Sequence, residues 1–139
     1  MTLLDEAQAI AGEVVAWRRE LHKIPEIGLL LPQTAAFVKA RLDEMGIAYT
    51  TFERHSGIVA LLGRPAGKTI ALRADMDGLR IGEESDFDYR SQNSNMHACG
   101  HDAHTAILLG AAKLLKQHEA QLNGKEELLF QPAEEGPGQ

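Results

Sequence analysis

The sequence of 139 residues lacks the features that mark membrane, secreted and nucleic-acid-binding proteins. No apolar run approaches the roughly 18 residues that cross a bilayer, and the N-terminal segment lacks the pattern of a signal peptide. The single cysteine cannot form an internal disulfide, so we expect a cytoplasmic protein. A formal net charge of −6 argues against a nucleic-acid partner. The one basic cluster, Arg18, Arg19 and Lys23, is interleaved with Glu13 and Glu20 and predicts a solvated helix face.

Hydrophobic periodicity predicts three helices. Apolar residues recur at helical spacing over residues 3–23, and Pro25 should end this helix. A second helix is predicted over residues 32–46, where the final glycine is a favourable C-terminal cap. The third covers residues 103–118, with Asp102 as its expected N-cap.

Four short apolar runs, rich in β-branched or aromatic residues and bounded by turn signals, predict strands at residues 47–53, 57–62, 68–73 and 126–130. The first two are expected to form a hairpin, and residues 75–95 read as a long polar loop. Strands alternating with helices favour a single α/β domain in which helices pack on a mixed β-sheet. The chain ends on a polar Glu-Glu-Gly-Pro-Gly segment after a buried-looking strand, which we interpret as the mark of a fragment.

Residues capable of chemistry fall in three islands at predicted strand ends or at a helix start, where α/β proteins place their sites. The central island holds three of the six histidines and the only cysteine within residues 97–104. Cys99 and His101 are suited to zinc and similar metals, and we expect an irregular loop to present both inward. The alternative is that Cys99 is a small buried hydrophobe and the histidines bond to loop backbone. His104 falls in the first helical turn, where a structural role is favoured.

The other two islands are pairs of carboxylates. Asp75 and Asp77 are two residues apart and point the same way in an extended segment, so they can bind a metal or orient a ligand histidine. Glu134 and Glu135 are adjacent and should point apart, so one can bind a metal while the other takes a proton from metal-bound water. Surface aspartates and a solvated acidic turn are the respective alternatives.

Three strings resemble a known family: LRADMDGL (72–79), MHACGHDAHTAILLGAAKLL (96–115) and LFQPAEEGPG (129–138). They are similar to the aminoacylase/amidohydrolase branch of the metal-dependent exopeptidases, which includes hippurate hydrolases, indole-acetyl-amino-acid hydrolases and N-acetyldiaminopimelate deacetylases. The segment 18–47 also resembles the opening of that branch. The resemblance implies a zinc-exopeptidase-like catalytic domain, of which residues 1–139 would be the N-terminal part, without the smaller dimerisation domain.

The resemblance also implies a site for two divalent metal ions, which in the family are zinc, manganese, nickel or cobalt. Cys99 matches the ligand that bridges both metals, while His101 and Glu135 match further ligands. Glu134 matches the general base, and Asp77 matches the aspartate that orients a metal-site residue. The implied activity is hydrolysis of the amide bond of N-acyl amino acids or short peptides.

Two further histidine ligands of the family would lie outside this chain, so we expect no turnover from the 139 residues alone. The alternative function is an inactive metal-binding fragment or a folding unit that associates with itself as a homo-oligomer. Asp75 stands where the wider peptidase family has a ligand histidine, and the resemblance gives it no defined role.

Overall fold

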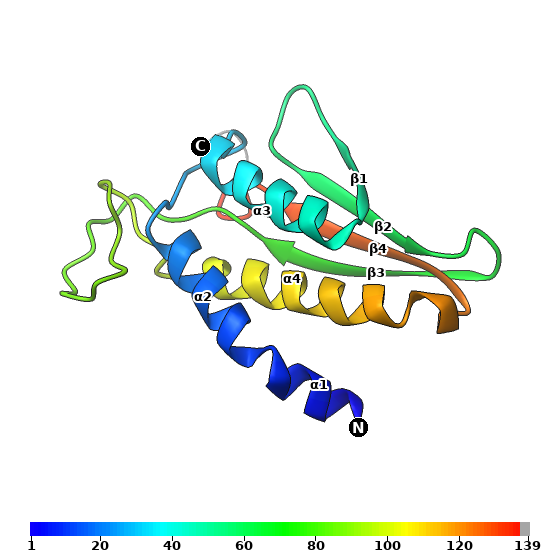
Figure 1. The fold of residues 1–139 in the computed structure, drawn as a ribbon. Helices are drawn as coiled ribbons and strands as arrows, with labels where there is room; N and C mark the ends of the chain where they lie inside the picture. Colours follow the sequence, from blue (N-terminus) through cyan, green and yellow to red (C-terminus); the bar gives the residue numbers. More distant parts are fainter. Residues whose placement is uncertain (137–139) are drawn as a thin grey trace.

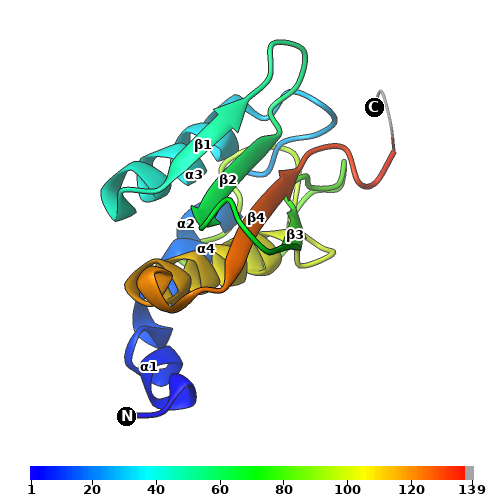
Figure 2. The same ribbon diagram turned by 90° about the vertical axis from the view of Figure 1, so that its right-hand side faces the viewer.

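The computed structural model describes residues 1–136, which form a layer of helices packed on one face of a four-stranded sheet (Figures 1 and 2). This confirms the predicted α/β class. The elements, in chain order, are α1 (Leu3–Ala9), α2 (Ala11–His22), α3 (Pro32–Met45), β1 (Ala48–Thr51), β2 (Ile58–Gly63), β3 (Lys68–Asp75), α4 (His101–Gln117), the short 3-10 helix η1 (Glu119–Gln121) and β4 (Gly124–Gln131).

The sheet is mixed, as predicted, with the strand order β1-β2-β4-β3. β1 and β2 form the expected antiparallel hairpin, and β2 is also antiparallel to β4. β3 and β4 are parallel, in a register that runs from Lys68 opposite Gly124 to Asp75 opposite Gln131. Parallel neighbours need a crossover connection, and α4 provides it. Because β3 and β4 run in the same direction, the residues that follow them emerge at the same end of the sheet, the carboxyl end of both strands.

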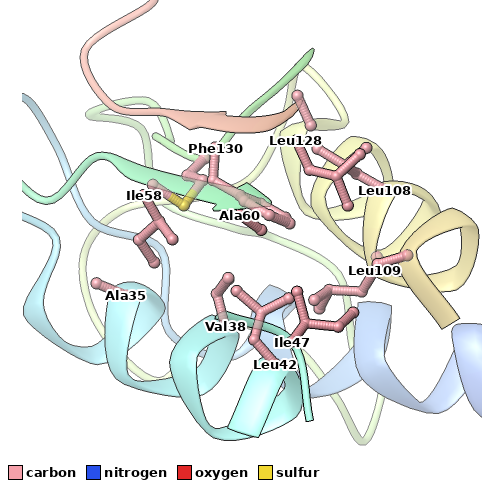
Figure 3. Close-up of a cluster of buried hydrophobic side chains, with 14 of the residues drawn as sticks. Ala35, Val38, Leu42, Ile47, Ile58, Ala60, Leu108, Leu109, Leu128 and Phe130 are labelled. Carbon is pink, nitrogen blue, oxygen red and sulfur yellow. The ribbon is translucent and has the colours of Figure 1, made fainter. Parts of the chain in front are cut away.

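The core lies between the covered sheet face and the helices. In β2, buried residues alternate with partly buried ones, as expected of a strand with one face packed and one face open. Figure 3 shows α3, α4 and the sheet converging on this core. Its labelled members are all at most 6% exposed: Ala35, Val38, Leu42, Ile47, Ile58, Ala60, Leu108, Leu109, Leu128 and Phe130.

Two predicted helix features are wrong. The single helix over residues 3–23 is two helices, because the backbone leaves helical geometry at Ile10 (φ −102°, ψ 4°). The apolar periodicity continues across that break and could not reveal it. The N-cap of α4 is Gly100 (φ 87°) and not Asp102, which lies within the first turn. A left-handed φ favours glycine, and the Asp102 carboxylate has partners elsewhere.

The other helix boundaries agree with their sequence signals. α3 begins at Pro32, whose fixed φ suits the first helical turn, and it ends at Gly46 in the left-handed conformation (φ 70°). Within the described part of the chain, no helix combines the length and the apolar character that crossing a membrane requires.

Candidate metal centre

The three segments of candidate residues meet at the end of the sheet where β3 and β4 terminate. β3 leads into Asp75 and Asp77, and β4 leads into the turn that carries the two glutamates. The loop after β3 returns to the same end of the sheet, where α4 begins. The beginning of α4 therefore lies beside the ends of both strands (Figure 1). The parallel pairing of β3 and β4 therefore brings together residues that are about 60 positions apart in the chain.

His101 is at the centre of this arrangement. It is the first residue of α4, and its side chain is 5% exposed. Its Nδ1 donates a hydrogen bond to the backbone carbonyl oxygen of Asp77 at 2.8 Å. A neutral imidazole that donates from Nδ1 has its lone pair on Nε2. Asp75 Oδ2 and Glu135 Oε1 are each 3.5 Å from Nε2, and Glu134 Oε2 is 3.7 Å from it.

Cys99 and Glu135 complete a group of potential ligands with His101. One ligand atom from each of the three residues lies within 4.8 Å of the other two. Cys99 is exposed, so the prediction that the loop presents it inward is wrong, and so is the alternative of a buried small hydrophobe. His101 does face inward as expected.

The charges around Cys99 fit a bound cation. A hydrogen bond to Glu135, desolvation by neighbouring atoms and the negative charges of Glu135, Glu134 and Asp77 together raise the pKa of the thiol to about 11. Without a cation the sulfur therefore stays protonated at neutral pH. A divalent metal reverses that balance, because a coordinating thiol loses its proton. A thiol, an imidazole nitrogen and a carboxylate form a donor set suited to zinc and related transition metals.

Asp77 forms hydrogen bonds to two of the candidate ligand residues, His101 and Glu135. The residue is 2% exposed. Its backbone carbonyl accepts from His101, and its carboxylate oxygen Oδ2 accepts from the backbone N–H of Glu135 at 3.0 Å. The other carboxylate oxygen is 3.3 Å from His101 Nδ1 and has no hydrogen-bond partner within residues 1–136. Asp77 thus fixes the ring orientation of one candidate ligand and the backbone of another.

Asp75 and His104 form a second pair beside His101. His104 Nδ1 donates to Asp75 Oδ1 at 2.7 Å, and the two histidine rings stack with centroids 5.7 Å apart. Burial raises the pKa of Asp75, but the hydrogen bond from His104 and the charges of both histidines outweigh it, so the pKa lies below its ordinary value. Asp75, His101 and His104 also place ligand atoms within 4.8 Å of one another. His104, to which the sequence assigned a structural role, is therefore part of the same cluster.

Glu134 and Glu135 do not separate as an extended strand would separate them. β4 ends at Gln131, and a turn with Ala133 at φ 54° precedes the pair. Strand alternation does not apply in a turn, and both carboxylates approach His101 Nε2. Glu135 is the less exposed of the two, with 27% of its side chain accessible against 38% for Glu134.

His97 is buried in the loop that leads to Cys99. Neither ring nitrogen has a hydrogen-bond partner in the described part of the chain, so the alternative of a histidine bonded to loop backbone is wrong for it. Burial, with the charges of His22 and His101, lowers the pKa of this imidazole to about 4 despite the nearby carboxylates of Asp102 and Asp77. His97 is therefore neutral at physiological pH.

A buried polar network next to the site was not found from the sequence. Asp102 accepts hydrogen bonds from Arg18 Nε at 2.8 Å and from His22 Nδ1 at 2.7 Å. His22 Nε2 lies 3.0 Å from Glu83 Oε1. Arg18 is thus not part of a purely solvated face, whereas Lys23 does make an exposed pair with Glu20. The partners are separated by 61 to 84 positions, so no local signal links them.

The fold and the donor set together define an α/β protein with a candidate site for divalent transition metals. Residues 71–139 match the model of the Peptidase family M20/M25/M40, and the chain resembles the N-terminal portion of the amidohydrolase branch of this family. It is 47% identical to the IAA-amino acid hydrolase ILR1-like 4 of Arabidopsis thaliana over 126 residues, 90% of this chain and 29% of that protein. It is also 47% identical to the N-acetyl-L-cysteine deacetylase of Bacillus subtilis (strain 168) over 142 aligned positions, 97% of this chain and 34% of that enzyme.

Solved structures agree with this assignment. A dinuclear metal-binding peptidase of the M20 family from Bacillus subtilis superposes with a TM-score of 0.86 at 38% identity, covering 92% of this chain and 36% of that one. The chain therefore spans about a third of the length of the relatives it matches. These findings confirm the resemblance drawn from the three sequence strings.

Proposed function

We propose that residues 1–139 are the N-terminal part of a catalytic domain that hydrolyses the amide bond of N-acyl amino acids or short peptides. The observation that carries the proposal is the convergence of Cys99, His101 and Glu135, with one ligand atom of each within 4.8 Å of the others. The names of the relatives, an IAA-amino acid hydrolase and an N-acetyl-L-cysteine deacetylase, support this substrate class. We also propose a cytoplasmic location, because a lone cysteine offers no internal disulfide.

Cys99, His101 and Glu135 are the residues that would hold the metal. Two divalent metal ions per complete site are supported by similarity to a dinuclear metal-binding peptidase. We propose zinc, manganese, nickel or cobalt, as the family resemblance implies. When bound, such ions polarise the substrate carbonyl and lower the pKa of a coordinated water. Asp77 keeps His101 in the tautomer whose Nε2 can bind a metal, because its carbonyl oxygen accepts the Nδ1 proton.

Glu134 is the proposed general base. Its carboxylate is 3.7 Å from His101 Nε2, beyond hydrogen-bond length, and its side chain is 38% exposed. It is thus close to the metal ligands without being held by them, and water and substrate can reach it. A carboxylate in this position takes a proton from the attacking water and gives it to the departing amine. Glu135 is held by Asp77 through its backbone, which suits a ligand better than a proton carrier.

A metal-binding titration tests the ligand set. We expect Zn²⁺ or Mn²⁺ to bind the chain in calorimetry, and Cys99→Ser to weaken that binding by at least about tenfold, because loss of an outer-shell partner of a metal ligand already costs that much. His118→Gln is the matched control, because it removes a histidine from the far end of α4. Equal affinity in Cys99→Ser and the unmodified chain would remove Cys99 from the site.

An activity assay tests whether residues 1–139 alone can hydrolyse the substrate. With added Mn²⁺ or Zn²⁺ we expect no turnover of N-acetyl or N-benzoyl amino acids, because the chain spans about a third of its relatives and the family resemblance implies further histidine ligands beyond the residues given. Turnover that disappears in Glu134→Ala would contradict that expectation and would identify the base at the same time.

A second candidate, a unit that associates with itself, is supported by the β3 edge. β3 is the last strand of the sheet, and its residues 68–73 are exposed. Ile70 and Leu72 are 56% and 38% exposed on this edge. Open strand edges with apolar side chains favour pairing with another chain. Sedimentation equilibrium should then show dimers or larger species that Ile70→Lys reduces, and a monomer at all concentrations would exclude this candidate.

A further inference from the structure

We propose that His22 is a positioning residue of the metal centre, acting through Asp102 on the first turn of α4 and hence on His101. The inference rests on the proposed function, since it concerns the same metal ligand. It assigns a role to a buried charge network that does not itself touch the candidate ligand atoms.

His22 connects two carboxylates that come from different segments. Its Nδ1 is 2.7 Å from Asp102 Oδ2, and its Nε2 is 3.0 and 3.1 Å from the two oxygens of Glu83. The side chains of His22, Asp102 and Glu83 are at most 4% exposed. An imidazole with a carboxylate at each nitrogen satisfies both only when both nitrogens carry protons. His22 then donates to both partners and holds them at fixed positions.

The charges of the network balance. Arg18 Nε donates to the same oxygen of Asp102 at 2.8 Å, so two cationic groups face two carboxylates. Buried charges are tolerated when they are paired and hydrogen-bonded, and removing one member leaves the others unpaired. His22 is the only member that contacts both carboxylates among the bonds of residues 1–136.

Through Glu83 the network fixes the loop that carries Cys99. Glu83 Oε1 accepts from the backbone N–H of Ser91 at 2.8 Å, and Glu83 Oε2 accepts from the hydroxyl of Ser85. The same loop is tied to the end of α2 by Gln92 N–H, which donates to the Lys23 carbonyl at 2.9 Å. The loop is therefore docked on the segment that contains His22.

Through Asp102 the network fixes the start of α4. Asp102 is the residue after His101, in the same helical turn, and it is 1% exposed. The turn begins at Gly100 in a left-handed conformation, and no side chain in the described range caps it. The contact with His22 and Arg18 thus anchors this turn to α2. Anchored there, His101 can keep its 2.8 Å bond to the Asp77 carbonyl and present Nε2 to the ligand group.

Two substitutions at His22 separate its contact with Asp102 from its contact with Glu83. The amide of asparagine can replace the Nδ1 donor to Asp102, and the longer glutamine can replace the Nε2 donor to Glu83. We expect His22→Asn to retain the position of His101 and His22→Gln to disturb it. Glu20→Gln is the matched control on the same helix, because Glu20 makes only an exposed pair with Lys23.

Two measurements report the result. In the metal-free chain, the NMR signal of the His101 Nδ1 proton, protected by its bond to Asp77, should persist in His22→Asn and disappear through exchange in His22→Gln. With Co²⁺, the visible spectrum should be unchanged in His22→Asn, whereas His22→Gln should alter the bands and weaken binding about tenfold. Circular dichroism identifies variants that have lost the fold.

The outcomes distinguish this inference from the proposed function. If His22→Gln matches the unmodified chain in both measurements, or if His22→Asn is disturbed as strongly as His22→Gln, positioning through Asp102 is refuted. If Co²⁺ binds none of the proteins, the proposed function fails, and the His101 proton signal still decides the inference. Should His22→Gln not fold, Asp102→Asn takes its place. It should shift the cobalt spectrum in the same direction by less, and an unchanged spectrum and proton signal would overturn the inference.

Discussion

Glu26 caps α3 from outside the helix, and removing it should destabilise the fold strongly. The residue before this helix, Leu31, makes no side-chain cap within the described chain, and Pro32 has no N–H. Glu26 instead accepts from the backbone N–H groups of Gln33 at 3.0 Å and Thr34 at 2.7 Å, and from the Thr34 hydroxyl at 2.7 Å. One carboxylate six residues before the helix therefore satisfies its first free donors.

The magnitude follows from three overlapping effects. Loss of a helix cap costs about 0.5–2 kcal/mol, and loss of a negative charge at a helix N-terminus about 0.3–1 kcal/mol. Thr34 is 1% exposed, so its hydroxyl would be left buried without an acceptor, at about 1–3 kcal/mol. Because these effects share the same atoms, we expect Glu26→Ala to lower the free energy of unfolding by about 3 kcal/mol. For a chain of this size that corresponds to a decrease in Tm of about 10 °C.

Urea denaturation followed by circular dichroism measures this directly. Glu26→Gln should lose about half as much as Glu26→Ala, because an amide oxygen still accepts hydrogen bonds but carries no charge. Glu20→Ala is the control, since the Glu20 side chain is 58% exposed and pairs only with Lys23. The capping argument is refuted if Glu26→Ala lies within about 0.5 kcal/mol of Glu20→Ala, the range of ordinary surface substitutions.

Three further predictions concern stability. The hydrogen bond from His118 to Glu6 raises the pKa of the imidazole above its ordinary 6.5. The hydrogen bond therefore stabilises the fold fully below about pH 6.5, and this stabilisation is lost as pH rises through the raised pKa of the folded state. Urea midpoints of His118→Gln and the unmodified chain should converge at alkaline pH, and a constant difference between them would contradict this prediction. Gly63→Ala should lower stability by more than about 1–2 kcal/mol, because φ is +88° and the new Cβ would meet the Gly124 carbonyl oxygen at 2.2 Å; an unchanged Tm would contradict it. Leu128→Ala removes a fully buried side chain and should cost about 2–5 kcal/mol in urea denaturation, with a loss under 1 kcal/mol as the contrary result.

Features with a local cause could be predicted from the sequence. The start of α3 at Pro32 and its end at Gly46 depend on the conformational limits of those two residues, and the β1–β2 hairpin depends on neighbouring apolar runs. The concentration of Cys99 and His101 in one short string is likewise a property of the chain itself. These signals were sufficient for the fold class and for the family resemblance.

The break in the first helix could not be predicted, because α1 and α2 have continuous apolar periodicity while only α2 contains buried residues. The orientation of Glu134 and Glu135 was also mispredicted, since the pair lies in a turn stabilised by the distant Asp77 and not in an extended strand.

By itself, the sequence determined which residue types could bind a metal and which family pattern they form, because both are written in short contiguous strings. Tertiary structure decided how those strings meet. The parallel pairing of β3 with β4 brings the Asp77 carboxylate to the backbone of Glu135, and the packing of α2 on α4 buries His22 between Asp102 and Glu83. Such contacts join positions dozens of residues apart, and their geometry depends on the folded chain as a whole.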